Sequence, residues 1–162
     1  MQKTASAVFF IKGDSMKIKV VNKSHHPLPS YKTDGACGMD LRANLEGPKI
    51  LKPLERAMIP TGLYFEIPKG IEGQVRARSG LSLKKGITLI NGIGTIDSDY
   101  RGELGILVVN LSNESVTIED GDRIAQLVFM AYQVAEWVQV DSLDVLSKTE
   151  RGEGGFGHTG LR

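Results

Sequence analysis

Short apolar runs separated by turn-forming residues constrain this sequence more than any other feature. Val, Ile and Thr recur within the runs, as is typical of β-strands, and separators such as Pro68-Lys69-Gly70 and Glu119-Asp120-Gly121-Asp122 favour turns. Many short strands at this spacing predict an all-β sandwich or barrel rather than a sheet built from βαβ units. The predicted strands are Lys17–Val21, Arg56–Ile59, Gly62–Ile67, Gly73–Arg78, Thr88–Ile90, Gly102–Asn110, Ser115–Ile118, Arg123–Phe129 and Glu136–Val140.

One segment predicts a short helix instead. Ser79 can cap the start of a helix and Gly86 can end it. Two lysines fall in the last turn, where the helix dipole favours positive charge. The free backbone N–H groups at Ser79 and Gly80, beside Arg78, would form an anion site. The alternative is a short connector whose arginine is solvated.

The length of 162 residues predicts a single domain with two appendages. Strand-like alternation begins directly after Met16, so residues 1–15 are predicted to be an extension without a function. Residues 147–162 hold five glycines and almost no aliphatic side chains. They are predicted to form a flexible arm that orders only when it binds something. Residues 16–146 are then the β domain.

The composition argues against several classes of protein. Twenty lysines and arginines balance nineteen acidic residues, so no nucleic-acid binding is expected. Apolar runs such as Ala7–Ile11 are too short to cross a membrane. A single cysteine, Cys37, excludes an intramolecular disulfide and suits the reducing cytoplasm. His25 and His26 are adjacent, so we expect their side chains to point in different directions, and no metal centre held only by the protein is predicted.

The segment Asn91–Glu103 lies between two predicted strands and is expected to form a hairpin arm. Asp97 follows the apolar Ile96, which favours a fixed carboxylate, and a fixed carboxylate can take a proton from water. The alternative is that Asp97 and Asp99 are turn residues, since aspartate favours turns.

Five segments together resemble the motifs of the trimeric dUTP diphosphatases (dUTPases), in the order found in that family and over nearly the whole chain. Each is weak alone, but the set is specific. Met39 and His158 depart from the pattern, because many members carry an aromatic residue and a serine there. The segments are Cys37–Ala43, Ala77–Leu81, Asn91–Glu103, Gly121–Leu127 and Arg151–Gly160.

The resemblance implies a jelly-roll homotrimer with shared active sites that hydrolyses dUTP to dUMP and diphosphate. This reaction would limit uracil in DNA and supply dUMP for thymidylate synthesis. Asp97 would orient and deprotonate the water that attacks the α-phosphate. Mg²⁺ would be held mainly by substrate phosphates, with Asp40 acting through the metal's water shell.

The resemblance also implies how the substrate is bound. Asn91 and the backbone that follows it would bind the uracil edge, and Tyr100 would pack under the deoxyribose. Gln126 would meet the phosphates, and the C-terminal arm would close over the occupied site. The implied substrate-binding residues are Arg78, Ser79, Gly80, Asn91, Gly94, Thr95, Ile96, Asp97, Tyr100, Gln126, Arg151, Phe156, Gly157, His158 and Thr159. Two alternatives remain at this point: a dCTP deaminase of the same fold, or a non-catalytic nucleotide-binding or regulatory trimer.

Overall fold

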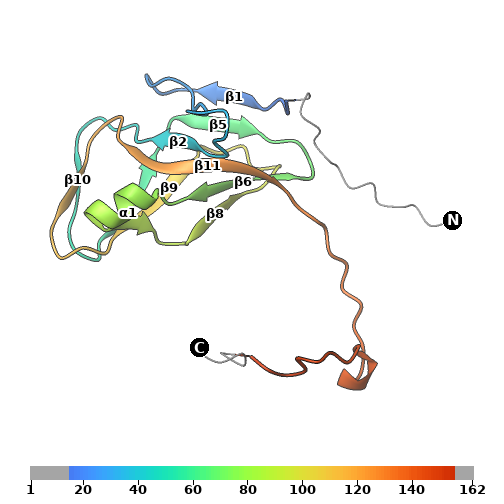
Figure 1. Ribbon diagram of the computed structural model, residues 1–162. Coiled ribbons are helices and arrows are strands. Elements are labelled where there is room, and N and C mark those ends of the chain that lie inside the picture. Colours follow the sequence, from blue (N-terminus) through green and yellow to red (C-terminus); the bar gives the residue numbers. More distant parts are fainter. Residues whose placement is uncertain (1–14, 156–162) are drawn as a thin grey trace. The chain divides into compact units, whose positions relative to one another are not determined.

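The computed structural model describes residues 15–155, which divide between Tyr132 and Gln133 into two compact units. Among the described residues, the first unit contains all the strands and the one α-helix, and the second contains a single 3₁₀ turn, η1 (Leu143–Val145). The prediction of an all-β domain with one short helix is therefore confirmed (Figure 1). None of the helices among residues 15–155 is long and apolar enough to cross a membrane.

The strands of the first unit pair antiparallel throughout. The sheet that carries most of the predicted site has the order β2-β11-β6-β8, and Figure 1 shows β11 running along the domain between β2 and β6. A second sheet has the order β4-β9-β7, and two further pairs are β1-β5 and β3-β10. The bounds are β1 Lys19–Asn22, β2 Met39–Arg42, β3 Lys49–Leu51, β4 Arg56–Pro60, β5 Leu63–Glu66, β6 Ile71–Arg76, β7 Ile87–Leu89, β8 Ile93–Ile96, β9 Gly105–Asn110, β10 Val116–Ile118 and β11 Arg123–Ala131.

The apolar side chains on the inward faces of these strands form the core. On β6 the burial alternates residue by residue, and its buried Val75 lies opposite the buried Leu127 of β11. A fully buried leucine or isoleucine stabilises the fold by about 1.5–3 kcal/mol. The fully buried large side chains are Leu41, Leu51, Ile59, Ile87, Leu104, Ile106, Val108, Asn110 and Leu127.

The predicted strand Glu136–Val140 is wrong, because residues 133–141 form no strand in the structure. Its apolar side chains are exposed, with Trp137 94% and Val138 81% accessible. Alternating apolar residues form a strand only where a neighbouring strand completes the ladder and a surface covers one face. The second unit offers neither to this segment within the described residues.

Helix α1 (Ser79–Lys85) forms where it was predicted, but its start differs in detail. The N-cap residue is Arg78, which has an extended backbone and makes no side-chain capping bond, and Ser79 is the first helical residue. The prediction that Ser79 caps the helix is therefore wrong. The end is as predicted, since Gly86 adopts the left-handed conformation (φ 67°) and its N–H donates to the Ser82 carbonyl.

Candidate active site

An aspartate held between two arginines lies where β2, β11 and the start of α1 meet. Asp40 Oδ1 is 2.8 Å from Arg78 Nε, and Asp40 Oδ2 is 3.0 Å from Arg123 Nη1. Arg78 Nη1 also donates to the Arg123 carbonyl at 2.7 Å, which fixes its guanidinium. The Asp40 and Arg78 side chains are only 20% and 27% exposed. Two cations against one carboxylate leave a local surplus of positive charge, which favours an anionic ligand.

Gln126 on β11 is fixed beside this cluster. It pairs in register with Asp40 of β2, and its Nε2 donates to the Ala77 carbonyl at 3.0 Å. The chain passes close to it at Gly38, where an added Cβ would lie 2.5 Å from Gln126 Oε1. Gly38 therefore leaves room for the Gln126 side chain to keep this position.

The structure thus brings together Asp40, Arg78 and Gln126, and it places Ser79 and Gly80 at the exposed N-terminal end of α1. Arg123 was not among the predicted site residues. A sequence signal existed, because Arg123 directly follows the Gly121-Asp122 turn inside one of the five motif-like segments.

The predicted arm is present, but it is not a simple hairpin. β7 and β9 pair with each other, as expected for strands flanking an arm, while the segment between them contributes β8 to the edge of the other sheet, against β6. Asn91 lies in the turn before β8, where the Ile93 N–H donates to its carbonyl at 2.8 Å. Gly94, Thr95 and Ile96 lie on β8, opposite Val75, Gln74 and Gly73.

Asp97 follows β8 directly and is exposed. Its backbone carbonyl accepts from the Tyr100 N–H at 3.2 Å, so Asp97 begins a turn. Tyr100 is fixed in that turn, because its hydroxyl donates to the Glu103 carbonyl at 3.0 Å. Asp97 is therefore a turn residue whose carboxylate faces solvent, which keeps it accessible to water or a ligand.

The arm and the arginine cluster lie at opposite edges of one sheet. Asp40 lies opposite Gln126, Gln126 opposite Arg76, and Arg76 opposite Ile93. Asp40 and Ile96 are separated by three strand spacings of about 4.8 Å across the sheet and by three residues of about 3.3 Å along β8. These two displacements are perpendicular, so the Cα atoms of Asp40 and Ile96 lie roughly 17 Å apart. This is far beyond the reach of two carboxylates that act on one phosphate group.

The pocket beside the cluster is also small. It borders Asp40, Arg42 and Arg123 and encloses about 120 Å³, whereas pockets for small-molecule ligands enclose about 300–1,000 Å³. Within residues 15–155, one copy of the chain therefore does not bring the predicted site residues together in one pocket.

Of the predicted C-terminal site residues, Arg151 is described and lies in the second unit. Arg151 is exposed, and its Nε donates to the Gly154 carbonyl at 2.6 Å within a local turn. The predictions for Phe156, Gly157, His158 and Thr159 fall outside the residues that the structure describes.

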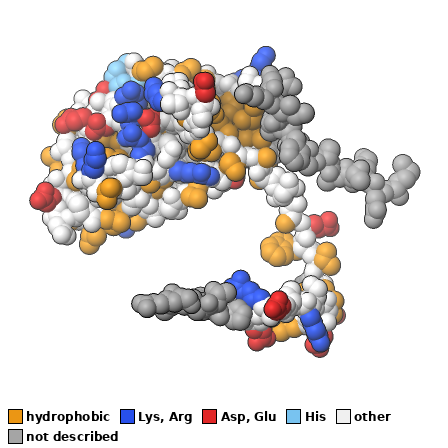
Figure 2. Space-filling view, viewed as in Figure 1, with side chains coloured by type: hydrophobic (Ala, Val, Ile, Leu, Met, Phe, Trp, Pro, Cys, Tyr) orange, Lys and Arg blue, Asp and Glu red, His pale blue; other side chains and the backbone are white. Residues whose placement is uncertain are grey.

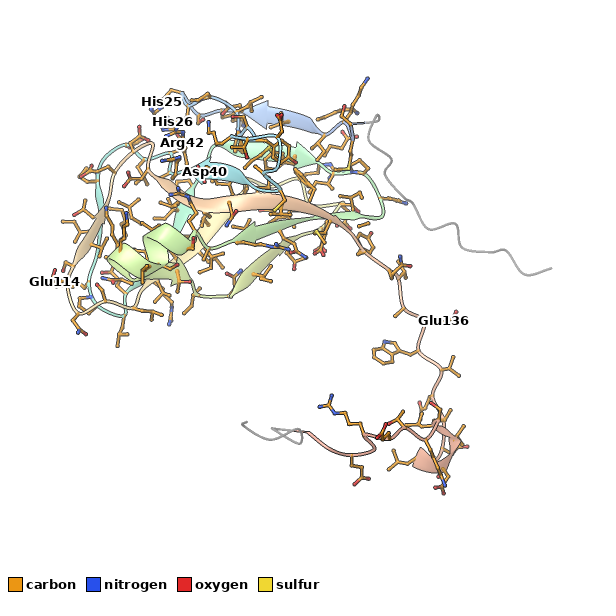
Figure 3. The ribbon with its side chains drawn as sticks, viewed as in Figure 1. His25, His26, Asp40, Arg42, Glu114 and Glu136 are labelled. Atoms are coloured by element: carbon orange, nitrogen blue, oxygen red, sulfur yellow. The ribbon has the colours of Figure 1, made fainter. Side chains whose placement is uncertain are left out.

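The expectation that His25 and His26 point in different directions is wrong. Both Nε2 atoms approach the Asp120 carboxylate, His25 at 2.8 Å and His26 at 2.9 Å. Figure 3 labels the two histidines next to each other. The Leu45 N–H bond to Asp120 Oδ1, followed by the His26 contact, holds the pKa of the Asp120 carboxyl well below its usual range.

Fold and site define an all-β protein with an arginine-rich anion site beside a short helix. The dUTPase family model matches residues 24–160. The chain is 60% identical over 145 residues to a deoxyuridine 5'-triphosphate nucleotidohydrolase of Finegoldia magna, covering 90% of this chain and 99% of that one. The identity to the protein of the same name from Treponema denticola is 60% over 134 residues, covering 83% and 91%. The chain belongs to the dUTPase family, and its activity is the hydrolysis of dUTP.

Solved structures agree with this assignment. The dUTPase of Staphylococcus bacteriophage 80alpha with dUpNHpp has a TM-score of 0.79 at 30% identity, covering 91% of this chain and all of that one. A mutant dUTPase of phage phi11 of S. aureus has a TM-score of 0.71 at 25% identity, covering 80% and 99%, and is described with a structural Mg(II) ion.

Proposed function

We propose that dUTP is hydrolysed by a water that Asp97 orients and deprotonates for attack on the α-phosphate, in active sites shared between the subunits of a homotrimer. The observation that carries this proposal is the separation of Asp97 from the Asp40–Arg78–Arg123 cluster across the β2-β11-β6-β8 sheet. One subunit would supply the cluster, and the arm of a second would bring Asp97 to the same nucleotide.

The Asp40–Arg78–Arg123 cluster and the start of α1 would bind the phosphates. Arg78 is held in place by Asp40 and by the Arg123 carbonyl, so little conformational entropy is lost when it meets a phosphate. Ser79 and Gly80 add exposed backbone N–H groups, and Gln126 adds an amide near the phosphates or their waters. Charge neutralisation and positioning are what attack on a polyphosphate chiefly requires.

The donor chemistry of this site fits Mg²⁺ held mainly by the substrate. Both Asp40 oxygens already form ion pairs with guanidinium groups, so Asp40 suits contact with metal-bound water rather than direct ligation. Mg²⁺ keeps several waters and binds substrate phosphates readily. When bound, it would neutralise phosphate charge and orient the α-phosphate for attack.

The arm Asn91–Glu103 would select the base and the sugar. Asn91 and the backbone of Gly94, Thr95 and Ile96 would pair with the uracil edge, and a base with a mismatched donor would leave buried groups unpaired. Tyr100, fixed through Glu103, would pack under the deoxyribose. The C-terminal arm would then close over the nucleotide and exclude water, using Arg151, Phe156, Gly157, His158 and Thr159.

Two further features support the assembly and its setting. Val134, Trp137 and Val138 are large apolar side chains exposed on the second unit, as expected of a surface that another subunit covers. Cys37 is free and exposed, which suits the reducing cytoplasm. There the enzyme would limit uracil in DNA and supply dUMP for thymidylate synthesis.

The role of Asp97 is tested by Asp97→Asn, which keeps the shape of the side chain and removes its basicity. We expect turnover to fall by about 100-fold or more, as for loss of a general base, while the dissociation constant for dUpNHpp changes little. Asp99→Asn is the matched control, since Asp99 is an exposed carboxylate in the same turn. Turnover that survives in Asp97→Asn, or falls equally in both variants, contradicts the assignment.

The sharing of sites is tested by mixing two inactive variants. Arg78→Ala removes the cluster and Asp97→Asn removes the base. After joint refolding in equal amounts, three quarters of cyclic trimers contain both variants. Each mixed trimer holds one site with both native residues, so about a quarter of the native turnover should return. A site contained in one chain predicts no recovery.

A further inference from the structure

Two histidines and an aspartate outside the proposed active site converge on one point of the surface. His25 and His26 lie in the loop after β1, and Asp120 lies in the turn before β11. One ligand atom from each can be chosen so that all three lie within 4.8 Å of one another. From this geometry we infer that His25, His26 and Asp120 form a binding site for a divalent transition-metal ion of the zinc class.

The donor set fits such an ion. Imidazole nitrogen and carboxylate oxygen are common zinc ligands, and three protein ligands with one open position are typical of zinc sites that also hold a water. Ligand atoms in a tetrahedral zinc site lie about 3.4 Å apart, given bonds of about 2.0–2.1 Å. The Nε2 atoms already lie 2.8 and 2.9 Å from the two Asp120 oxygens. Small side-chain movements would therefore admit the ion.

Asp120 is available for a metal in a way that Asp40 is not. Asp40 is neutralised by two permanently charged arginines. Among the described residues, the ion-pair partners of Asp120 are only the two histidines. An imidazole can give up its proton and become a ligand, whereas an arginine cannot.

Neighbouring residues hold two of the three ligands, His26 and Asp120, in place without an ion. The His26 carbonyl accepts from Asn22 Nδ2 at 2.8 Å, and the His26 N–H donates to Ser24 Oγ at 3.2 Å. Asp120 Oδ1 accepts from the Leu45 N–H at 2.9 Å, a contact that would orient the carboxylate as an outer-shell donor. Ligands that are already ordered lose little entropy on binding.

The site is also open to solvent. The His25 side chain is 67% exposed and that of Asp120 is 31% exposed, which provides an entry path and room for a water ligand. Figure 2 shows the histidine surface at one end of the strand-rich unit, next to lysine and arginine side chains. A bound ion would tie the loop before Asp40 to the turn before Arg123, which are distant in sequence.

The test is zinc titration of the full-length, tag-free protein without nucleotide, followed by calorimetry. We expect about one zinc ion per chain at this site and a rise in the unfolding temperature with ZnCl₂ that MgCl₂ does not produce. His25→Ala should weaken zinc binding by about 100-fold or more, since even outer-shell losses cost 10–100-fold. Because His25 is largely exposed, this variant should fold. Asp120→Asn should weaken binding similarly while retaining an acceptor for the Leu45 N–H.

Two controls remove the cysteine and the remaining histidine of the chain, which has three histidines and one cysteine. Cys37→Ser and His158→Ser should bind zinc as the native protein does. Cobalt should give the visible absorption of a four-coordinate ion in the native protein and in both controls, and should lose it in His25→Ala. The inference is overturned if no zinc binds, if His25→Ala binds it unchanged, or if a control variant loses it. None of these readouts depends on dUTP turnover.

Discussion

Adding one methyl group at Gly38 should disturb Gln126, which lies on another strand. The new Cβ would lie 2.5 Å from Gln126 Oε1 and 3.5 Å from Val128 Cγ2. Cβ atoms essentially never lie that close to another heavy atom, so the flexible amide has to move while the Val128 contact stays ordinary. That movement breaks the 3.0 Å bond from Gln126 Nε2 to the Ala77 carbonyl.

The expected cost can be worked from these contacts. Loss of the bond, with the Ala77 carbonyl left without its partner, costs about 1–2 kcal/mol of unfolding free energy. Replacement of glycine by alanine returns about 0.4–1 kcal/mol by restricting the unfolded chain. Gly35→Ala is the matched control, because its Cβ would meet nothing within 4 Å. Gly38→Ala should therefore be about 1–2 kcal/mol less stable than Gly35→Ala.

The assay is urea denaturation at one fixed subunit concentration, since oligomer stability depends on concentration. The cause is isolated by repeating Gly38→Ala in a Gln126→Ala background, where the clash is absent. The penalty of about 1–2 kcal/mol should then disappear. Equal stability of the two glycine variants, or an unchanged penalty in the Gln126→Ala background, refutes the reasoning.

Two further predictions concern the turns. Gly86→Ala places a Cβ on a residue with φ 67° and only 2.8 Å from the Ser112 backbone nitrogen. It should lower the free energy of unfolding, measured by urea denaturation, by roughly 2 kcal/mol. The control is Gly47→Ala, whose Cβ meets nothing within 4 Å, and an equal loss in both variants contradicts the prediction. Because the folded pKa of Asp120 is lowered, its contribution to stability is fully present above the unfolded value of about 3.9 and is lost as the pH falls through the lower folded value. In metal-free buffer, the difference in unfolding free energy between the native protein and Asp120→Asn should therefore become smaller as the pH falls below about 4. A difference that stays constant or grows contradicts this prediction.

The clearest of the predicted strands is one that buries a regular row of residues. β6 alternates buried and half-buried residues along its length, and its pattern is visible in the sequence as Ile71, Gly73 and Val75. The three strands that were not predicted from the sequence lack such a row. β2 and β3 each bury a single residue, Leu41 and Leu51, and β8 buries none. A strand held mainly by its neighbours' hydrogen bonds leaves little periodicity to read.

The candidate site was predictable by residue type but not by arrangement. Asp40 and Arg78 are found in motif-like segments, yet their contact depends on where β2 lies relative to α1, which local sequence does not encode. His25 and His26 were expected to diverge because adjacent side chains alternate along a strand. They lie instead in an irregular loop closed by Ser24, where that alternation does not apply.

The order of the β2-β11-β6-β8 sheet is the reason why the proposed mechanism requires a second copy of the chain. β2 carries Asp40 at one edge of this sheet, and β8 leads into Asp97 at the other edge. The two intervening strands fix the distance between these residues, so no rotamer change within one chain can close it. Two edges of an open sheet can meet over one nucleotide only if the sheet closes on itself or if a neighbouring copy presents its edge. The sheet is open within residues 15–155, so the proposed mechanism takes the missing carboxylate from a neighbouring copy.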